Sequence, residues 1–125
     1  MGRIREFIEI EGHKCWTMFD TGARNTYVTK DVAKLLIKSK LHKPFRSKLG
    51  GSVKVTRQSA ILDAKIQGHA ITTQAMVVDR ICRDDDGKSF EVLFGALAMQ
   101  QWGIRPIPDQ EKLDMTHYPD VFVEF

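Results

Sequence analysis

The amino-acid sequence predicts a mostly β domain with one or two short helices. Residues Ile4–Ile10 alternate apolar and charged side chains, which is the period of a half-buried strand. Glycine-containing turns separate several further runs rich in β-branched and aromatic residues, a pattern typical of hairpins. Only two stretches show helical spacing. At 125 residues the chain is long enough to bury one hydrophobic core, so we expect a single domain over residues 1–125.

The first hairpin leads directly to a polar segment. Ile4–Ile10 is followed by the turn Glu11-Gly12-His13 and by a returning strand, Lys14–Phe19. This strand delivers Asp20 at its end. A few residues later, Thr26–Val28 is again β-prone and predicts a short strand.

A helix is expected next. Thr29 can cap a helix over Lys30–Lys38, because a threonine hydroxyl can accept a hydrogen bond from a free N–H of the first turn. One face of that helix would be apolar, formed by Val32, Leu35 and Leu36.

Two hairpins are predicted in the middle of the chain. Phe45–Leu49 and Val53–Arg57 are strand-like and flank Gly50-Gly51, two residues that tolerate the positive φ of a tight turn. Ala60–Ile66 and Ile71–Val78 form a second expected pair across another glycine-containing turn.

The last part of the chain combines strands with the second helix. Phe90–Phe94 is the last predicted core strand and stops at Gly95, after which Ala96–Trp102 has helical spacing. Two prolines downstream are expected to interrupt regular structure. The apolar segment Val121–Phe125 predicts a terminal strand.

Charge is distributed unevenly along the chain. The net charge is +3, but residues 30–57 contain nine Lys or Arg residues and a single acid, Asp31. Such a block can attract nucleic acid, an anionic surface or an acidic substrate, or it can be a solvated face. The sequence leaves both interpretations open.

Composition argues against several classes of site. Cys15 and Cys82 lie far apart without metal-binding spacing and are expected to be buried, reduced thiols. The histidines show no ligand spacing and no phosphate-binding glycine loop is present, so we expect no metal and no cofactor. No apolar run could span a membrane and the start of the chain lacks a signal-peptide core, which predicts a cytoplasmic protein without a membrane partner.

The most informative motif is Met18-Phe19-Asp20-Thr21-Gly22-Ala23, an apolar strand that ends in a carboxylate, a hydroxyl and a glycine. A second apolar run, Val92-Leu93-Phe94-Gly95, stops at glycine before the helix over Ala96–Trp102. This ordered pair of motifs resembles the retropepsin-like aspartic proteases, the single-domain relatives of pepsin. The resemblance covers most of the chain. It implies a closed β-barrel or sandwich that functions as a two-fold homodimer.

The resemblance also implies a reaction. Two carboxylates that share one proton can serve as base and acid in peptide hydrolysis, the aspartic-protease dyad being the standard example. The chain contains one Asp-Thr-Gly, so a dyad requires two subunits that each contribute Asp20. Thr21 would then hydrogen-bond its counterpart across the dimer, and Gly22 would let the backbone approach the substrate closely.

Substrate-binding residues follow from the same resemblance. Ala23 and Arg24 would line the cleft, and the hairpin over residues 45–57, with Gly50 and Gly51 at its tip, would be a flap that closes over the substrate. A peptide or protein substrate would bind in an extended conformation. The two terminal strands would pair either between subunits or within their own subunit, and both arrangements stay open.

Two positions depart from the family pattern. The residues after Gly95 are Ala96 and Leu97, so the polar residue that usually ties this helix to the active-site loop is absent. Arg24 stands where relatives often carry Ser or Asp. It is expected either to favour an acidic side chain in the peptide or to pair with an acid such as Asp31.

Two other functions are compatible with the sequence. The same dimeric fold could bind a peptide or a partner protein without cleaving it. A nucleic-acid-binding role for residues 30–57 is less favoured, because Phe45 is the only aromatic residue there that could stack on a base. We therefore predict a homodimeric aspartic endopeptidase.

Overall fold

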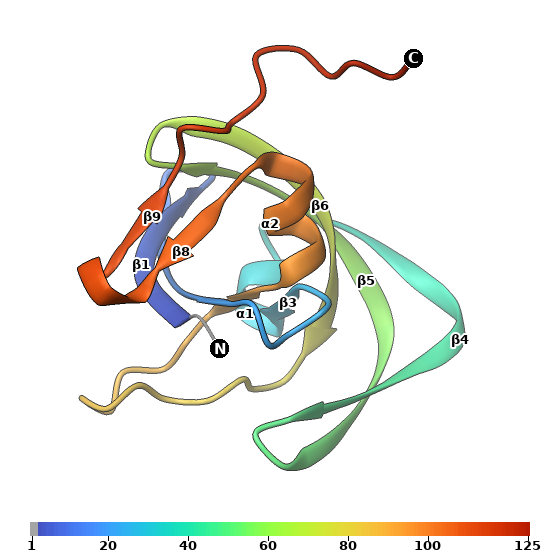
Figure 1. Cartoon of the computed structure of the whole chain (residues 1–125). Coiled ribbons are helices and arrows are strands. Elements are labelled where there is room, and N and C mark those ends of the chain that lie inside the picture. The colour runs from blue at the N-terminus through green and yellow to red at the C-terminus, as the bar shows by residue number, and fades with distance from the viewer. Residues whose placement is uncertain (1–2) are drawn as a thin grey trace.

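The computed structural model describes residues 3–125 and contains one seven-stranded sheet, one two-stranded sheet and two α-helices (Figure 1). This confirms the prediction of a mostly β chain with one or two short helices. The strand order of the large sheet is β1-β2-β7-β3-β6-β5-β4, and Glu9 of β1 also pairs with Lys65 of β5. No helix among residues 3–125 is long and apolar enough to cross a membrane. The elements are β1 (Arg3–Ile10), β2 (His13–Asp20), β3 (Tyr27–Thr29), α1 (Lys30–Ala33), β4 (Ile37–Leu49), β5 (Ser52–Ile66), β6 (His69–Val78), β7 (Val92–Phe94), α2 (Ala96–Trp102), β8 (Arg105–Ile107), a 3-10 helix (Pro108–Gln110) and β9 (Lys112–Asp114).

The β1–β2 hairpin confirms the first predicted strand pair and has two different faces. Cys15 and Phe19 are buried on one face of β2, whereas Trp16 and Met18 are half-buried on the other. Successive side chains of a strand point to opposite faces. Asp20 therefore leaves the end of β2 on the same face as Trp16 and Met18.

Strand β7 completes the middle of the large sheet. It runs parallel to β2, with Phe19 opposite Phe94, and antiparallel to β3, with Tyr27 opposite Leu93. Parallel strands end at the same edge of a sheet, so the segment after β2 and the segment after β7 meet there. This arrangement positions the candidate site.

Helix α1 is much shorter than the sequence suggested. The predicted helix over residues 30–38 is wrong beyond Ala33, because Ile37–Lys40 belong to β4 and pair with Gln58–Ile61 of β5. Thr29 does precede the helix as its N-cap residue, but its side chain makes no capping hydrogen bond. Pairing with a distant strand outweighs the local helical pattern here.

The β4–β5 hairpin confirms the predicted turn at Gly50 and Gly51, whose φ angles are +58° and +86°. Its strands are longer than expected. Val53–Arg57 and Ala60–Ile66, predicted as separate strands, form the single strand β5, which then pairs with β6 as predicted.

Buried apolar residues form two clusters on opposite sides of the sheet. The larger one contains Phe19 and Phe94, with ring centroids 5.1 Å apart, and reaches Trp102 of α2. The smaller one, which we call the cleft-side cluster, consists of Tyr27, Met76, Val78, Ile81, Phe90 and Leu93, with Trp16, Met18, Ala23, Leu41, Phe45 and Leu49 packed against it.

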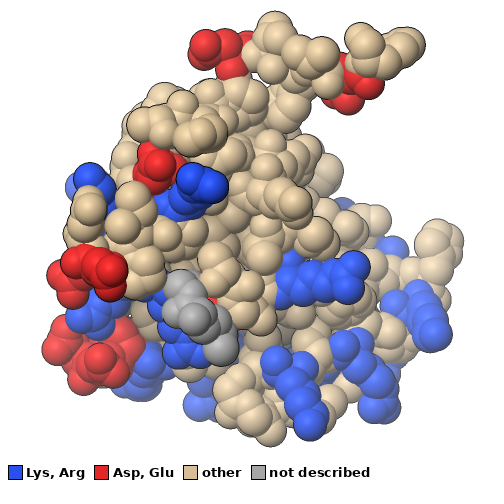
Figure 2. All heavy atoms as spheres, in the orientation of Figure 1, with Lys and Arg blue, Asp and Glu red and all other residues tan. Residues whose placement is uncertain are grey.

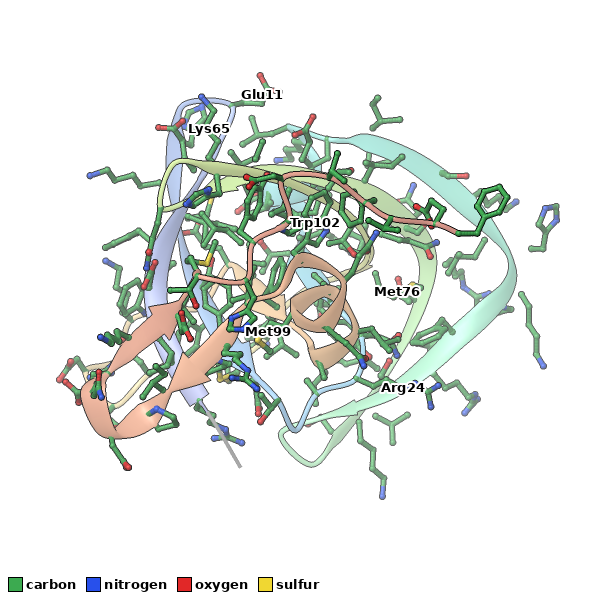
Figure 3. The ribbon with its side chains drawn as sticks, turned by 45° about the horizontal axis from the view of Figure 1, so that its top comes forward. Glu11, Arg24, Lys65, Met76, Met99 and Trp102 are labelled. Atoms are coloured by element: carbon green, nitrogen blue, oxygen red, sulfur yellow. The ribbon has the colours of Figure 1, made fainter. Side chains whose placement is uncertain are left out.

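The C-terminal segment differs most from the prediction. The expected strand over Val121–Phe125 is wrong: these residues are irregular and exposed, and Phe122 forms a T-shaped ring pair with Trp102, at 5.2 Å between centroids. Helix α2 is confirmed over Ala96–Trp102, and Figure 3 shows Met99 and Trp102 along it. Despite Pro106, residues 105–107 pair with residues 112–114 as the two-stranded sheet.

Candidate active site

Asp20 is held at the end of β2 by its own turn. Asp20 is only 6% exposed, and its Oδ1 atom accepts a hydrogen bond from the Gly22 N–H at 2.8 Å. The Ala23 N–H donates to the Asp20 carbonyl oxygen at 3.1 Å. A short loop thus closes around one largely buried carboxylate.

The second carboxylate oxygen of Asp20 faces Arg3. The Arg3 Nε atom lies 3.2 Å from Asp20 Oδ2, and the arginine side chain is 64% exposed. The register of the hairpin explains this contact, since Arg3 and Asp20 are direct cross-strand partners. Arg3 was missed from the sequence. A two-residue turn at Glu11 and Gly12 would have placed it opposite Asp20.

The loop after Asp20 is fixed to the start of α2 by three hydrogen bonds. The Ala96 N–H donates to the Ala23 carbonyl oxygen at 2.7 Å and the Leu97 N–H donates to the Arg24 carbonyl oxygen at 3.1 Å. The Gly95 N–H donates to the buried Thr26 Oγ1 at 3.0 Å. Backbone groups and Thr26 therefore make the connection for which the sequence lacked a polar side chain.

Gly95 is required by close packing at this contact. A Cβ atom at this position would overlap the carbonyl group of Asn25. The end of β7, the loop after Asp20 and the start of α2 therefore pack directly backbone against backbone. Thr26 was read from the sequence only as a β-prone residue, and nothing local indicated its bond to a residue 69 positions away.

The structure brings residues 20–24 together in this loop. Thr21 and Gly22 are exposed in the turn, Ala23 is half-buried against the cleft-side cluster, and Arg24 is exposed. The expected pairing of Arg24 with Asp31 is wrong, because Asp31 lies 3.3 Å from Lys34 and, within residues 3–125, Arg24 forms no ion pair. The other expectation for Arg24, an acidic side chain of the peptide, stays a prediction.

The β4–β5 hairpin is connected to the same region through its inner face. The Tyr27 hydroxyl donates to Ser47 Oγ at 3.0 Å, and Phe45 and Leu49 pack against the cleft-side cluster that also receives Ala23. Gly50 and Gly51 stand beyond these contacts at the exposed tip of the hairpin.

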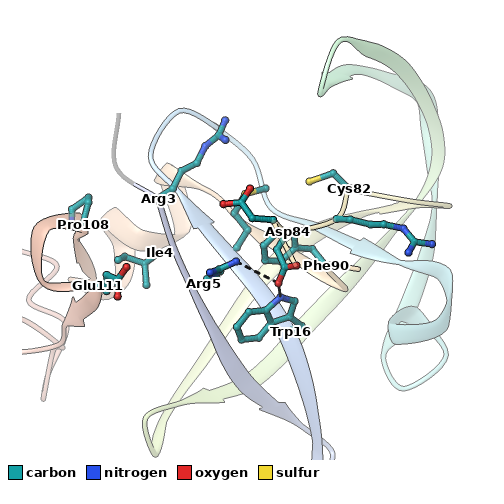
Figure 4. Close-up of a pocket in the computed structure, with 12 residues that line it drawn as sticks. Arg3, Ile4, Arg5, Trp16, Cys82, Asp84, Phe90, Pro108 and Glu111 are labelled. Atoms are coloured by element: carbon teal, nitrogen blue, oxygen red, sulfur yellow. Dashed lines mark hydrogen bonds and ion pairs between the residues drawn. The ribbon is translucent and has the colours of Figure 1, made fainter. Parts of the chain in front are cut away.

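A pocket of about 480 Å³ opens along the half-buried face of β1 and β2 (Figure 4). Trp16, Met18 and Phe90 form apolar parts of its lining, and Trp16 and Phe90 stack at 6.0 Å between ring centroids. Arg3 and Cys82 contribute polar parts. Since Arg3 contacts Asp20, this pocket leads toward the candidate catalytic carboxylate.

Asp84 also lines this pocket and binds several neighbouring groups. Its Oδ2 atom accepts a hydrogen bond from Trp16 Nε1 at 2.9 Å and lies 3.5 Å from Arg5, while Oδ1 accepts the N–H groups of Asp86 and Lys88. The net pKa of Asp84 is lowered. Desolvation, the largest single influence, acts in the raising direction, but the hydrogen bonds from Lys88, Trp16 and Asp86 and the charge of Arg5 together outweigh it.

Neither cysteine has a thiol pKa lowered toward neutral pH. Burial, assisted by the nearby Glu91 carboxylate, raises the pKa of the Cys15 thiol to about 11. Cys82 is exposed, so the prediction of a buried thiol is wrong for it, although partial burial also raises its pKa. Among residues 3–125, no group of three or more His, Cys, Asp or Glu side chains could hold a metal ion.

Comparison with known proteins identifies the class. The sequence profile of the aspartyl protease family matches residues 8–97, a range that includes the Asp20 loop, the hairpin and Gly95. The chain belongs to the aspartyl protease family. No curated protein sequence matches it significantly.

Solved structures place the fold among the retropepsin-like domains. The retroviral protease-like domain of Ddi1 from Leishmania major is 13% identical, with a TM-score of 0.65 over 94% of this chain and 90% of that one. The EIAV protease, solved with the inhibitor HBY-793, is 19% identical, with a TM-score of 0.56 over 84% and 92%. The simian foamy virus (mac) protease is 17% identical, with a TM-score of 0.52 over 82% and 99%. The predicted retropepsin-like fold is thereby confirmed.

Proposed function

We propose that this protein is a homodimeric aspartic endopeptidase in which each subunit contributes Asp20. The observation that carries the proposal is the largely buried Asp20 carboxylate, placed by β2 in a loop that is fixed to α2 through Gly95 and Thr26. Catalytic groups act best when their positions are set before the substrate arrives. A loop held by three hydrogen bonds to a helix meets that requirement.

The chemistry would follow from two carboxylates in contact. Like charges at short distance cannot both be ionised, so one Asp20 would carry a proton while the Asp20 of the partner subunit is ionised. The ionised carboxylate would take a proton from water as the water oxygen attacks the peptide carbonyl carbon. The protonated carboxyl would give its proton to the carbonyl oxygen. The carboxyl that took the proton from water would then give it to the amide nitrogen, while the other carboxylate takes a proton from a hydroxyl of the tetrahedral intermediate. The C–N bond would break as the carbonyl re-forms, and the dyad would again hold one proton.

The substrate would be an extended peptide held between the Asp20 loop and the β4–β5 hairpin. Support comes from the cleft-side cluster, against which Ala23 of the loop and Phe45 and Leu49 of the hairpin all pack. The hairpin would act as a flap, with Gly50 and Gly51 over the peptide backbone, and Ala23 and Arg24 would line the cleft. A cytoplasmic location stays a prediction.

The test compares wild type with Asp20→Asn on a pool of denatured proteins between about pH 4 and about pH 8. We expect cleavage by wild type only, with a rate that rises as the square of enzyme concentration when the enzyme is dilute, because two subunits form one site. Urea unfolding of both proteins provides the control that the variant is folded. A folded wild type that cleaves nothing in the pool would contradict the proposal.

One observation favours a second candidate, a dimer that binds peptides without cleaving them. Arg3 already occupies Asp20 Oδ2, the atom that a dyad would need to share. If Asp20 serves only as a structural partner of Arg3, both wild type and Arg3→Ala should bind peptide without cleaving it. Cleavage by either protein that is abolished by Asp20→Asn would exclude this candidate.

A further inference from the structure

Most cations in residues 30–57 have no carboxylate partner in the described structure. Two of the nine are ion-paired, Lys34 with Asp31 and Lys54 with Asp79, each at 3.3 Å. Figure 2 shows Lys and Arg side chains gathered on the side where Figure 1 places β4 and β5. The remaining seven are all exposed: Lys30, Lys38, Lys40, Lys43, Arg46, Lys48 and Arg57.

A groove of about 530 Å³ lies beside this hairpin, and we call it the basic groove. Its charged lining consists of Lys30, Lys54, Arg57 and Asp79, and its walls include Val53, Val55, Val77 and Val78. Since Asp79 is already paired with Lys54, the cations of Lys30 and Arg57 remain unbalanced. None of residues 20–24 lines the groove, and it shares no lining residue with the pocket of about 480 Å³ beside Arg3.

The groove exists because β5 and β6 separate. Their ladder pairing ends at Ser59 and Met76, and beyond it the Thr56 hydroxyl, a side chain of β5, donates to the Val77 carbonyl oxygen of β6. On the side of the groove, residues 53–58 of β5 have no ladder partner among the described strands. An unpaired strand edge can receive an extended polypeptide through backbone hydrogen bonds.

We propose that the basic groove binds an extended, acidic segment of a polypeptide. The Arg57 guanidinium can hold a carboxylate through two N–H groups, and the Lys30 ammonium supplies a second cation at the other wall. The valine walls accept small apolar side chains between the acidic ones. Recruitment of a substrate through this segment rests on the proposed peptidase function, whereas binding of the segment does not.

The lining favours a peptide over two other anionic partners. Single-stranded nucleic acid needs exposed aromatic rings for stacking, but Phe45, the one aromatic residue of this block, packs against the cleft-side cluster. Anchoring in a membrane surface needs large apolar side chains, and the groove offers valines.

Fluorescence anisotropy on the 125-residue chain with Asp20→Asn tests the proposal without cleavage. The probes are short labelled peptides in which Thr alternates with Glu, Gln or Lys. We expect binding of the Glu peptide only, weakened about tenfold by the double variant Lys30→Gln/Arg57→Gln and by raising salt from about 0.05 M to about 0.3 M. The control Lys65→Gln/Lys112→Gln removes two exposed cations outside the groove, and should bind within about twofold of the parent chain.

Several results would overturn the proposal. Equal weakening by both double variants would mean that net charge alone attracts the peptide. Tighter binding of oligothymidylate, or of phosphatidylserine vesicles, than of the Glu peptide would assign the surface to nucleic acid or lipid. Absence of Glu-peptide binding at low salt would also reject the groove as a peptide site.

A cleavage assay separates this proposal from the proposed function. An acidic extension added to a cleavable peptide should lower KM about tenfold for wild type, whereas for Lys30→Gln/Arg57→Gln the extended and unextended peptides should have the same KM. Each protein is compared only with itself, and in each the extension should leave kcat unchanged. An inactive wild type would contradict the peptidase proposal but leave the anisotropy result standing. An active wild type whose KM ignores the extension would reject recruitment through the groove.

Discussion

The hydrogen bond from the Gly95 N–H to Thr26 Oγ1 predicts a specific loss of stability. Thr26→Val keeps the shape of the side chain but removes the acceptor, so the Gly95 N–H is left unpaired in a buried position. A buried donor without a partner costs about 1 to 3 kcal/mol. We therefore expect the free energy of unfolding to fall by about that amount.

The same magnitude can be expressed as a melting temperature. For a chain of 125 residues, the entropy of unfolding is about 260 cal/mol/K, so each kcal/mol shifts the melting temperature by about 4 °C. Thr26→Val should thus melt about 4 to 11 °C below wild type. Cleavage should also slow, because the loop that carries Asp20 loses one of its three connections to α2.

Urea unfolding followed by tryptophan fluorescence measures the effect. Thr72→Val is the matched control, because it makes the same substitution at an exposed position of β6 and should change stability by less than about 0.5 kcal/mol. Gly95→Ala challenges the same contact sterically and should be at least as damaging. The reasoning is refuted if Thr26→Val is no less stable than Thr72→Val.

Four further predictions concern other parts of the fold. Iodoacetamide at about pH 8 should modify exposed Cys82 before Cys15, and equal rates would contradict the burial of Cys15. Because the unfolded Cys15 thiol ionises near 9.0 and the folded one near 11, stability relative to Cys15→Ala should fall as pH rises between these values, by at most about 1.4 kcal/mol per unit. Because the pKa of Asp84 is lowered in the folded protein, its contribution to the free energy of unfolding is complete above pH 3.8 and is lost as the pH falls below that value. An Asp84→Ala variant whose stability falls with acid pH as that of wild type does would argue against this. Gly103→Ala should lower the melting temperature more than Gly68→Ala, since both have positive φ but only at Gly103 would a Cβ strike a neighbouring carbonyl; similar losses would reject the steric argument.

Local patterns predicted the elements that depend on local chemistry. The alternation of Ile4–Ile10 and the Gly50-Gly51 turn both correspond to observed hairpins, and Gly95 followed by a helical pattern corresponds to α2. In each case the side-chain period or the turn residue directly determines the backbone. The Asp20 motif likewise indicated a strand that ends in a loop.

Errors occurred where a distant partner decides the structure. Residues 37 and 38 were assigned to the end of the predicted helix, but they belong to β4 and pair with β5 about twenty residues later. Residues 105–107 contain a proline and still form an edge strand, because a two-stranded pair leaves one side of each strand free of ladder bonds. Val121–Phe125 has a strand-like composition and finds no partner strand within the described chain.

The candidate site was predictable in its motif but not in its connections. Asp20 and its neighbours were identified correctly as one loop, whereas the partners of that loop, Arg3 and Thr26, were not. Arg3 could have been found by counting the register of the first hairpin. Thr26 could not, since its role depends on where β7 brings Gly95 in space.

The position of β7 also has a consequence for the order in which the protein can assemble during synthesis. Residues 92–94 fill the place between β2 and β3, so a nascent chain that has emerged only to residue 91 has two strands with open inner edges. The Asp20 loop also lacks its contacts with Gly95, Ala96 and Leu97 at that stage. Ribosome-bound chains stalled before residue 91 emerges should therefore leave this loop open to proteases, and emergence of residue 97 should protect it. On this view, the Asp20 loop acquires its contacts with α2 only after residues 95–97, far downstream of Asp20 in the chain, have emerged.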